Sequence, residues 1–281
     1  MTYVRDALID YHIHTTFSED GRSSPEECAA AAVSRGLGGV TFTEHLEFIP
    51  DLDDPEPAYV PGRVLSAASY LKAVTTLRRT WGQRITIGLG AELGLEPHNL
   101  KAYEPYLREH RLSFDYVLGS FHSVLGTLVQ LSEFTDPLGP KAAARLYFER
   151  LLEGTKRAIE LKACDVLGHL DLVKRSPSFG AFRLANHRHE VEEILRTIIA
   201  AGMGLEVNTS GWRQPPREPY PGLDTLKLYR RLGGEIVTVG SDSHAASTVG
   251  LESARALEFI RAAGFTRLAL FSDRKARFVS I

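Results

Sequence analysis

Two histidines one residue apart form the first candidate site for chemistry in this chain. They are His12 and His14, in the segment IDYHIH. On an extended strand, residues i and i+2 point to the same side, so both imidazoles can bind one metal ion, with Asp10 on the same face as an orienting carboxylate. The same spacing recurs at His187 and His189, but that pair falls in a predicted helix, where a two-residue step turns the rings apart by about 200°. We therefore predict a metal-binding pair at His12 and His14, and solvated surface residues at His187 and His189.

Potential metal ligands also end the other apolar runs of the chain. In order they are His45, Glu92, His122, His169, Glu206 with Asn208, and Asp242 with His244. Together with His12 and His14, six of the ten histidines therefore stand at the end of a strand-like run. Imidazole and carboxylate donors without thiolates suit zinc, manganese or iron. Taken alone, Glu92 could serve as a cap or in a salt bridge. Inside an apolar strand, however, its buried charge needs compensation, which a metal ion provides.

The elements that must position these residues are strands alternating with amphipathic helices. We predict strands at residues 7–12, 38–45, 85–92, 116–122, 165–171, 204–210 and 235–244, with a weaker one at 267–272, and helices at 25–36, 63–81, 140–163, 189–202 and 251–264. Alternating βα units imply a parallel sheet, and seven or eight of them favour a closed barrel over an open, doubly wound sheet. The carboxyl ends of barrel strands converge on one mouth, where the candidate ligands would meet.

Local signals fix the start of the first helix and mark two long connections. Ser24 is the predicted N-cap, Pro25 takes the first helical position and Glu27 completes a capping box. The longest connections, residues 46–62 and 123–139, both follow a strand and would lie at the mouth of the barrel. Loops of this length in a compact domain are usually functional or disordered. We expect them to form walls or lids over a site.

Composition places the chain among ordinary globular proteins. Of its 281 residues 43% are hydrophobic and 24% charged, and the net charge of −2 gives no general attraction to nucleic acid or acidic membranes. Its two cysteines, Cys28 and Cys164, show no CxxC spacing, and no stretch approaches the roughly 18 apolar residues of a membrane helix. We expect a cytoplasmic protein without nucleic-acid or membrane partners. The sequence leaves open whether the chain forms a homo-oligomer.

Seven short motifs together resemble the PHP superfamily of metal-dependent phosphoesterases. They are HIH, SEDG, TEH, GAE, GSFHS, GHLD and SDSH, in the order of the family and spread over nearly the whole chain. The segments GSFHS, GHLDLVKR and LEVNTSGWR look most like the stand-alone histidinol-phosphate phosphatases of histidine biosynthesis. The resemblance implies a distorted seven-stranded (β/α) TIM-like barrel, with residues 1–281 forming a single domain.

The resemblance also implies three divalent metal ions. The first would be bound by His12, His14 and Asp242, with Glu92 bridging to the second, which adds His122 and His169. The third would be bound by Asp20, His45 and His244. Many relatives carry a histidine at the position of Asp20, and Glu19 is adjacent.

The activity implied is hydrolysis of L-histidinol phosphate, with water activated by metal ions attacking phosphorus in line. Glu92 and Asp242 would take part as ligands, and Asp171 as an orienting group or acid. Arg175 and Arg213 follow ligand-bearing strands and would bind the phosphate, with Lys174 as a further candidate, because the planar fork of arginine matches phosphate oxygens. Trp212 and the acidic loop 51–57 are candidates for contact with the organic end of the substrate.

Three other functions are compatible with parts of the pattern. A metal-dependent amidohydrolase shares the barrel and the first HxH, but it bridges its metals with a carboxylated lysine, and no predicted strand here ends in lysine. A phosphoesterase of the same family could act on nucleotides, nucleic-acid ends or phosphotyrosine. A non-catalytic metal-binding accessory module is the third alternative, although the ligand set is complete.

Overall fold

The central element of the computed structural model is one parallel sheet of seven strands. The structure describes residues 8–47, 65–110, 113–180 and 182–281. The strands follow one another in chain order, which is typical of a barrel: β1 (Ile9–Ile13), β2 (Gly39–Leu46), β3 (Thr86–Gly94), β4 (Tyr116–Ser120), β7 (Val166–Leu167), β8 (Gly204–Asn208) and β9 (Val237–Gly240).

The sheet curls until its two edge strands meet. An isolated parallel bridge joins Ile13, at the end of β1, to Ser243, just after β9. Asp10 strengthens this junction because its carboxylate accepts hydrogen bonds from the backbone N–H groups of Ser241 at 2.8 Å and Gly250 at 2.7 Å. With β7 reduced to two paired residues, the barrel is nearly closed and distorted, which confirms the predicted fold.

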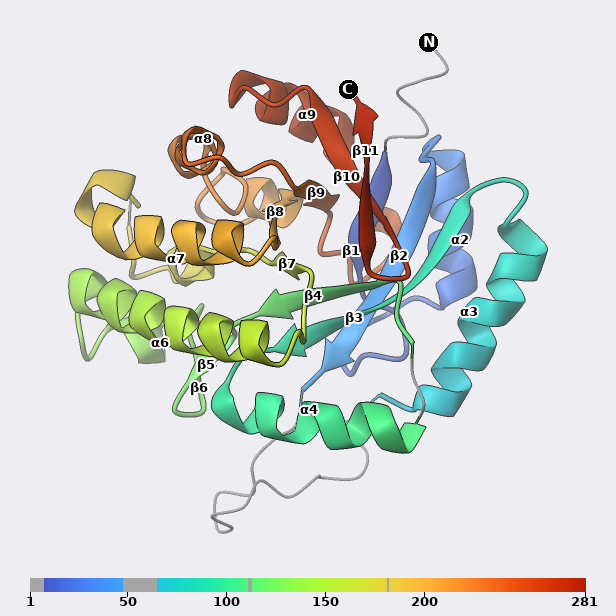
Figure 1. Ribbon diagram of the computed structural model, residues 1–281, viewed down its shortest axis with the longest axis horizontal. Helices are drawn as coiled ribbons and strands as arrows, with labels where there is room; N and C mark the ends of the chain where they lie inside the picture. Colours follow the sequence, from blue (N-terminus) through green and yellow to red (C-terminus); the bar gives the residue numbers. More distant parts are fainter. Residues whose placement is uncertain (1–7, 48–64, 111–112, 181) are drawn as a thin grey trace.

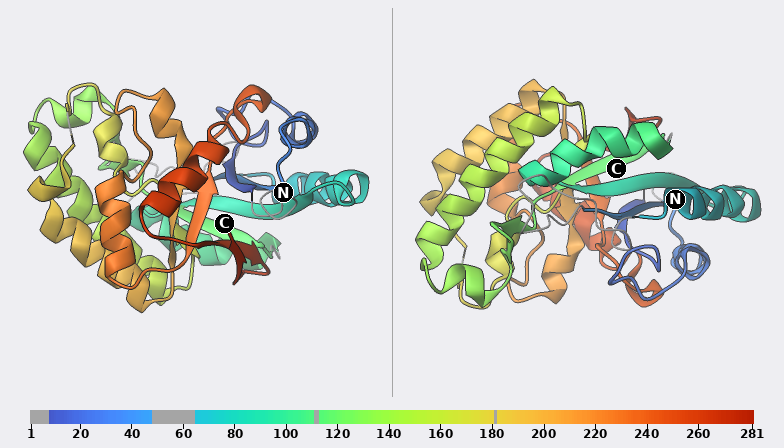
Figure 2. Two further views of the ribbon diagram at one scale, coloured as in Figure 1. Left: turned by 90° about the horizontal axis from the view of Figure 1, so that it is seen from above. Right: turned by 90° about the horizontal axis from the view of Figure 1, so that it is seen from below.

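Helices surround the strands. They are α2 (Pro25–Ser34), α3 (Ala67–Trp81), α4 (Pro97–His110), α5 (Ser132–Thr135), α6 (Pro140–Glu160), α7 (Arg188–Ala200), α8 (Leu223–Arg231) and α9 (Ser253–Ala262). Helices α2 and α3 pack together on one side of the strands, and α6 and α7 lie on the other (Figures 1 and 2). Helices α4 and α8 were not predicted. In the part of the chain that the structure describes, no helix is long and apolar enough to span a membrane.

Burial along the strands follows from this arrangement. All the residues of β1, β4, β8 and β9 are buried, as expected for parallel strands covered on both faces. The weaker strand predicted at 267–272 does form, as β10 (Arg267–Ser272), but it lies outside the barrel and pairs with β11 (Lys275–Ser280) in a hairpin. The Tyr11 hydroxyl in β1 accepts a hydrogen bond from the backbone N–H of Phe271, which fastens this hairpin to the barrel.

The predicted helix start and one of the two long connections are described by the structure. Ser24 caps α2, with Pro25 in the first turn and the reciprocal hydrogen bonds to Glu27 that define a capping box, so this prediction is confirmed. Residues 123–139 form the short hairpin of β5 (Ser123–Val124) and β6 (Thr127–Leu128), followed by α5. The other connection, 46–62, lies outside the described residues from position 48 onward.

Candidate metal centre

The strand-end side chains converge around Glu92, at the carboxyl end of β3. One carboxylate oxygen, Oε1, lies 3.0 Å from His169 Nε2, 3.2 Å from His12 Nε2 and 3.4 Å from His122 Nε2. The other, Oε2, lies 2.9 Å from His45 Nδ1 and 3.4 Å from His14 Nε2. The side chain of Glu92 is only 1% exposed, so these imidazoles surround it almost completely. Both oxygens of this carboxylate therefore face potential metal ligands.

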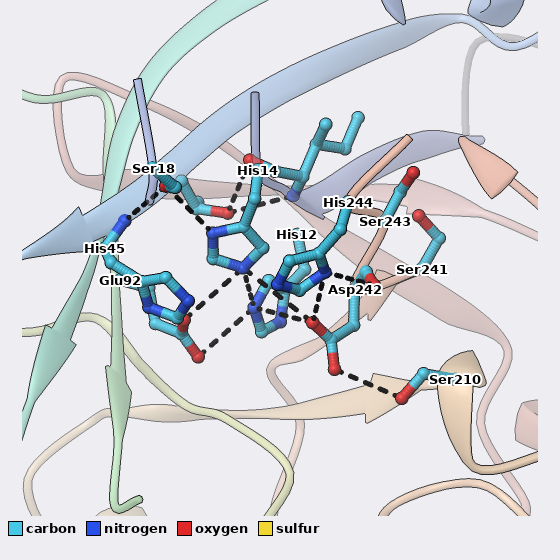
Figure 3. A network of polar contacts seen from close by, with 12 residues as sticks. His12, His14, Ser18, His45, Glu92, Ser210, Ser241, Asp242, Ser243 and His244 are labelled. Atoms are coloured by element: carbon cyan, nitrogen blue, oxygen red, sulfur yellow. Dashed lines mark hydrogen bonds and ion pairs between the residues drawn. The ribbon is translucent and has the colours of Figure 1, made fainter. Parts of the chain in front are cut away.

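Among the residues that the structure describes, four groups of three donors lie close enough to hold a metal ion. Their ligand atoms fall within 4.8 Å of one another in the sets His12–His14–Glu92, Glu92–His122–His169, His14–His45–His244 and His45–Glu47–His122. Figure 3 shows His14, His45 and His244 on one side of His12, with Glu92 and Asp242 facing the same group of rings. The structure thus brings together histidines and a carboxylate that the family resemblance assigned to neighbouring metal sites.

Asp242 and Asp20 lie beside these donor groups. Asp242 Oδ1 lies 3.7 Å from His12 Nε2 and 3.8 Å from His14 Nε2. Asp20 reaches in from the loop after β1, with Oδ2 at 2.9 Å from His244 Nε2 and Oδ1 at 3.7 Å from His45 Nε2. Asp242 has a positive φ of 52°, a conformation that costs energy for a non-glycine residue and recurs at functional sites.

The donor set fits divalent cations. The Nε2 atoms of His12 and His14 face each other at 3.0 Å, and those of His122 and His169 at 3.2 Å. Glu92 Oε2 is buried and, among the described residues, accepts no hydrogen bond. Facing nitrogen lone pairs and a buried carboxylate are stabilised by a cation between them, and imidazole with carboxylate is a donor set that such ions bind. The residues therefore form a site for divalent metal.

The electrostatics of the cluster link its carboxylates to its imidazoles. Burial alone would raise the pKa of Glu92, but the surrounding imidazoles, His12 first, outweigh it and hold the pKa well below its usual range. For Asp242 burial acts in the same direction, and His12, His244 and His14 again hold the pKa far below normal. Burial and the neighbouring imidazoles lower the pKa of His14 well below its ordinary value. Burial also acts to lower the pKa of His12 and of His122, but nearby carboxylates outweigh it and raise both well above normal. Ionised carboxylates and neutral imidazoles are the forms that bind metal, so a cation that binds here would release protons from these two rings.

A second group of carboxylates lies behind the donors and orients them. Glu206, at the end of β8, accepts a hydrogen bond of 2.7 Å from His12 Nδ1, which turns His12 Nε2 toward Glu92. Its other oxygen accepts from the backbone N–H of His169 at 2.9 Å. Metal-binding histidines usually donate their second ring N–H to a carboxylate in this way. The strand-end pattern had marked Glu206 only as another potential ligand.

Glu47 is a further acidic residue at the site that sequence reasoning missed. Its carboxylate is hydrogen-bonded to Nδ1 of His122, and it forms one of the donor groups with His45 and His122. The signal was present, because Glu47 follows His45 by two residues at a strand end, the spacing that identified His12 and His14. Asp10, expected to orient the histidine pair, instead binds backbone amides at the junction of β1 and β9.

The donors line a cavity of about 550 Å³ at the mouth of the barrel. Arg175 is in its wall, and the hairpin that follows β4 contributes Leu128 and Gln130, so this connection does form a wall. Among the described residues the guanidinium of Arg175 has no hydrogen-bond or ion-pair partner. Arg213 is not among the described residues that line the cavity. One of its guanidinium nitrogens donates to the Ser241 carbonyl at 2.6 Å, and Nη1 is buried without a partner in the described part of the chain.

Three other candidates lie away from this wall. The Lys174 ammonium is buried and bonded to Asp171 at 2.8 Å, and neither residue is among the described residues that line the cavity. Trp212 packs edge-on against Phe259, with the Arg255 guanidinium 4.3 Å from its ring centroid. The loop 51–57 lies outside the described residues.

The control pair differs from its prediction in one residue. His189 is exposed as expected, but His187 is buried where α7 begins and stacks on Phe182 with ring centroids 5.6 Å apart. The prediction of a solvated His187 is wrong because aromatic packing from the preceding segment covers the ring.

Comparison with known proteins identifies the class to which this barrel and site belong. The family model described as PHP domain matches residues 10–210, and the chain belongs to this family. It is 28% identical to the histidinol-phosphatase of Lactococcus lactis over 280 residues, 95% of each chain. It is 30% identical over 270 residues to a protein of Deinococcus radiodurans named "probable histidinol-phosphatase", covering 95% of this chain and 98% of the relative.

A solved structure shows the same architecture. The crystal structure of histidinol phosphate phosphatase from Lactococcus lactis, complexed with zinc, L-histidinol and phosphate, matches with a TM-score of 0.82 and 28% identity. The match covers 96% of this chain and 99% of that one. The predicted family and fold are therefore confirmed.

Proposed function

We propose that this chain hydrolyses L-histidinol phosphate to L-histidinol and phosphate, as a histidinol-phosphatase of histidine biosynthesis. The observation that carries the proposal is the convergence of five histidines on Glu92, beside a cavity that Asp20, Asp242, His244 and Arg175 also line. The named substrate is supported by the relatives, which match over nearly their full length. The proposal treats residues 1–281 as one domain, and the free, buried cysteines fit a cytoplasmic protein.

Three divalent ions are part of this proposal, with zinc, manganese or iron as the candidates. His12, His14 and Asp242 would bind the first, His122 and His169 the second, with Glu92 between them, and Asp20, His45 and His244 the third. When bound, such ions supply positive charge for the phosphate and lower the pKa of the attacking water.

The residues of the chain then hold and orient the substrate. Arg175, unpaired in the cavity wall, and the free Nη1 of Arg213 would donate hydrogen bonds to phosphate oxygens. Glu206 keeps the His12 ring in the orientation that presents Nε2 to the cavity. Phosphoryl transfer depends mainly on positioning and electrostatics, so a covalent nucleophile is not required.

The test is phosphate release from a substrate panel by protein loaded with manganese or zinc. The panel contains L-histidinol phosphate, an aryl phosphate, nucleoside monophosphates and a phosphotyrosine peptide. We expect the highest kcat/KM for L-histidinol phosphate, and a raised KM in Arg175→Gln but not in the matched control Arg188→Gln, whose guanidinium is exposed on α7. A clear preference for another phosphate ester would keep the site and reject the substrate.

A further inference from the structure

The ammonium group of Lys174 is buried and fully engaged. Its side chain is 0% exposed, and Nζ donates to Asp171 Oδ2 at 2.8 Å, Glu218 Oε1 at 2.9 Å and the Pro219 carbonyl at 2.9 Å. An ammonium has three N–H donors, so these three acceptors use all of them. The charge also lies 5.1 Å from the ring centroid of Tyr220. We call this set of residues, Asp171, Lys174, Glu218 and Pro219, the Lys174 clamp.

The clamp joins two turns that are far apart in sequence. On one side is the 3-10 turn η1 (Leu172–Arg175), which begins just after Asp171 and ends in Arg175, a residue of the cavity wall. On the other side are Glu218 and Pro219, in the segment that follows a second 3-10 turn, η3 (Thr209–Arg213). Turn η3 ends in Arg213. Both turns thus carry an arginine assigned to the phosphate.

The segment bound by Lys174 is itself fixed to η3 and to the barrel. Gly211 in η3 lies so close to it that an added Cβ would be 2.1 Å from the Glu218 carbonyl oxygen. Tyr220 exchanges two backbone hydrogen bonds with Asn208 at the end of β8, at 2.8 Å and 3.0 Å. Holding Glu218 and Pro219 therefore holds the position of η3 relative to η1.

The positions of the two arginines depend on the turns that carry them. Arg175 is the last residue of η1, and among the described residues its guanidinium has no hydrogen-bond or ion-pair partner. The guanidinium of Arg213 has one hydrogen bond, from Nη2 to the Ser241 carbonyl, and its Nη1 is buried without a partner in the described structure. Two guanidinium groups that bind one phosphate also repel each other, so rigid turns are needed to keep them at a fixed separation.

We propose that Lys174 is a positioning residue that fixes η1 against residues 218–220, so that Arg175 and Arg213 keep the separation a phosphate group requires. This inference rests on the proposed function, because it takes the two arginines as the phosphate-binding groups. It assigns Lys174 and Asp171 an indirect role through the arginines, in place of the direct contacts expected from the sequence.

The test uses inorganic phosphate as a competitive inhibitor of the metal-loaded enzyme. In Lys174→Met we expect the inhibition constant for phosphate and the KM to rise roughly ten- to a hundredfold, since small displacements of binding groups have effects of this size. The double variant Asp171→Asn/Lys174→Met leaves no buried, unpaired carboxylate at position 171, and the Glu218 side chain, 41% exposed, keeps contact with solvent. This variant should show the same rise if Lys174→Met alone does not fold. Bound metal should stay unchanged in both.

A double-mutant cycle separates positioning from general stability. In the Arg175→Gln background, Lys174→Met should raise the inhibition constant by no more than about twofold, because both changes remove the same interaction. The matched control is Arg274→Met, which breaks an ion pair with Asp165 at the amino-terminal end of β7. It should lower the melting temperature without changing phosphate affinity.

The outcomes distinguish the two proposals. If Arg175→Gln raises the inhibition constant while both clamp variants keep that of the parent, or if the effects of Lys174→Met and Arg175→Gln multiply, the clamp is wrong and the phosphate site stands. If Arg175→Gln itself leaves phosphate affinity unchanged, both the assigned phosphate site and the clamp are overturned. If the parent enzyme hydrolyses no phosphate monoester, the proposed function fails first.

Discussion

At the scale of single residues, the site consists of donors that face the cavity and carboxylates that orient them. Glu206 illustrates the second group. Its carboxylate accepts three hydrogen bonds, from His12 Nδ1, from the backbone N–H of His169 and, at 3.2 Å, from the Asn208 side-chain amide. Because this carboxylate can only accept hydrogen bonds, it fixes the proton of His12 on Nδ1 and leaves Nε2 free as a ligand.

We therefore predict that Glu206→Gln weakens metal binding although Glu206 is outside the donor groups. The amide can present an N–H to His12 Nδ1 and favour the wrong tautomer. We expect metal affinity or kcat to fall roughly ten- to a hundredfold. Metal content by elemental analysis and phosphate release would be measured together. The control Glu235→Gln alters an exposed surface pair with Arg267 and should change neither. Metal affinity and kcat equal to those of the parent in Glu206→Gln would contradict the orienting role.

Residue-level prediction from sequence succeeded where the strand period decided the result. His12 and His14 face one cluster because they are two apart on an extended strand. It failed where packing between turns decided the environment. His187 is covered by Phe182 from the segment just before it, and Lys174 is bound by the Glu218 carboxylate from a distant turn. Neither contact follows from the period of a helix or a strand.

At the scale of elements, short 3-10 turns after β7 and β8 carry the candidate phosphate-binding arginines. Their packing is close at Gly211, where a side chain would meet the Glu218 backbone. We predict that Gly211→Ala forces η3 away from this segment, lowers the free energy of unfolding by about 1–3 kcal/mol and raises KM. Urea denaturation and steady-state kinetics would measure the two effects.

A second glycine provides the control for Gly211→Ala. Gly36 has a φ of +72° and no neighbour within 4 Å of an added Cβ. Gly36→Ala should therefore cost about 1–2 kcal/mol through its left-handed backbone and leave KM unchanged. A KM for Gly211→Ala equal to that of Gly36→Ala would show that η3 does not position the substrate.

Elements were predictable from sequence where their signals are local. The capping box at Ser24 needs only four neighbouring residues, and it is present. Helix α4 carries Pro105 within a polar sequence, which hides its pattern. The strand β10 was recognised, but its partner β11 is mostly exposed and lacks an apolar run, so the hairpin outside the barrel was missed.

At the scale of the whole molecule, the barrel closes without a regular ladder between β1 and β9. Asp10 replaces part of that ladder by accepting N–H groups from both sides of the junction. Asp10→Asn would place an amide N–H against one of these donors. We expect a loss of about 1–3 kcal/mol in the free energy of unfolding, measured in urea. Asp136→Asn, at an exposed position after α5, is the control. If the two variants had the same free energy of unfolding, the role of Asp10 in stabilising the closed barrel would be contradicted.

Alkaline pH tests the burial of the two thiols across the fold. Burial raises the pKa of Cys28 and of Cys164 to about 12, from 9.0 for an ordinary thiol. The unfolded chain therefore loses thiol protons above pH 9 while the folded chain keeps them. This contribution to stability is complete below pH 9 and is lost as pH rises toward 12. Cys28→Ala/Cys164→Ala should show a smaller decline in unfolding free energy above pH 9. Parallel declines in parent and variant would contradict the prediction.

The central claim is that side chains at the strand ends form one metal-dependent phosphatase site around Glu92. The most direct measurement is phosphate release from L-histidinol phosphate by metal-stripped protein while manganese or zinc is titrated back, with bound metal measured in parallel. We predict no activity in the stripped protein and recovery as metal binds. Glu92→Gln should fail to recover, while the exposed control Glu153→Gln should behave like the parent. Full activity without metal, or full recovery in Glu92→Gln, would contradict this account.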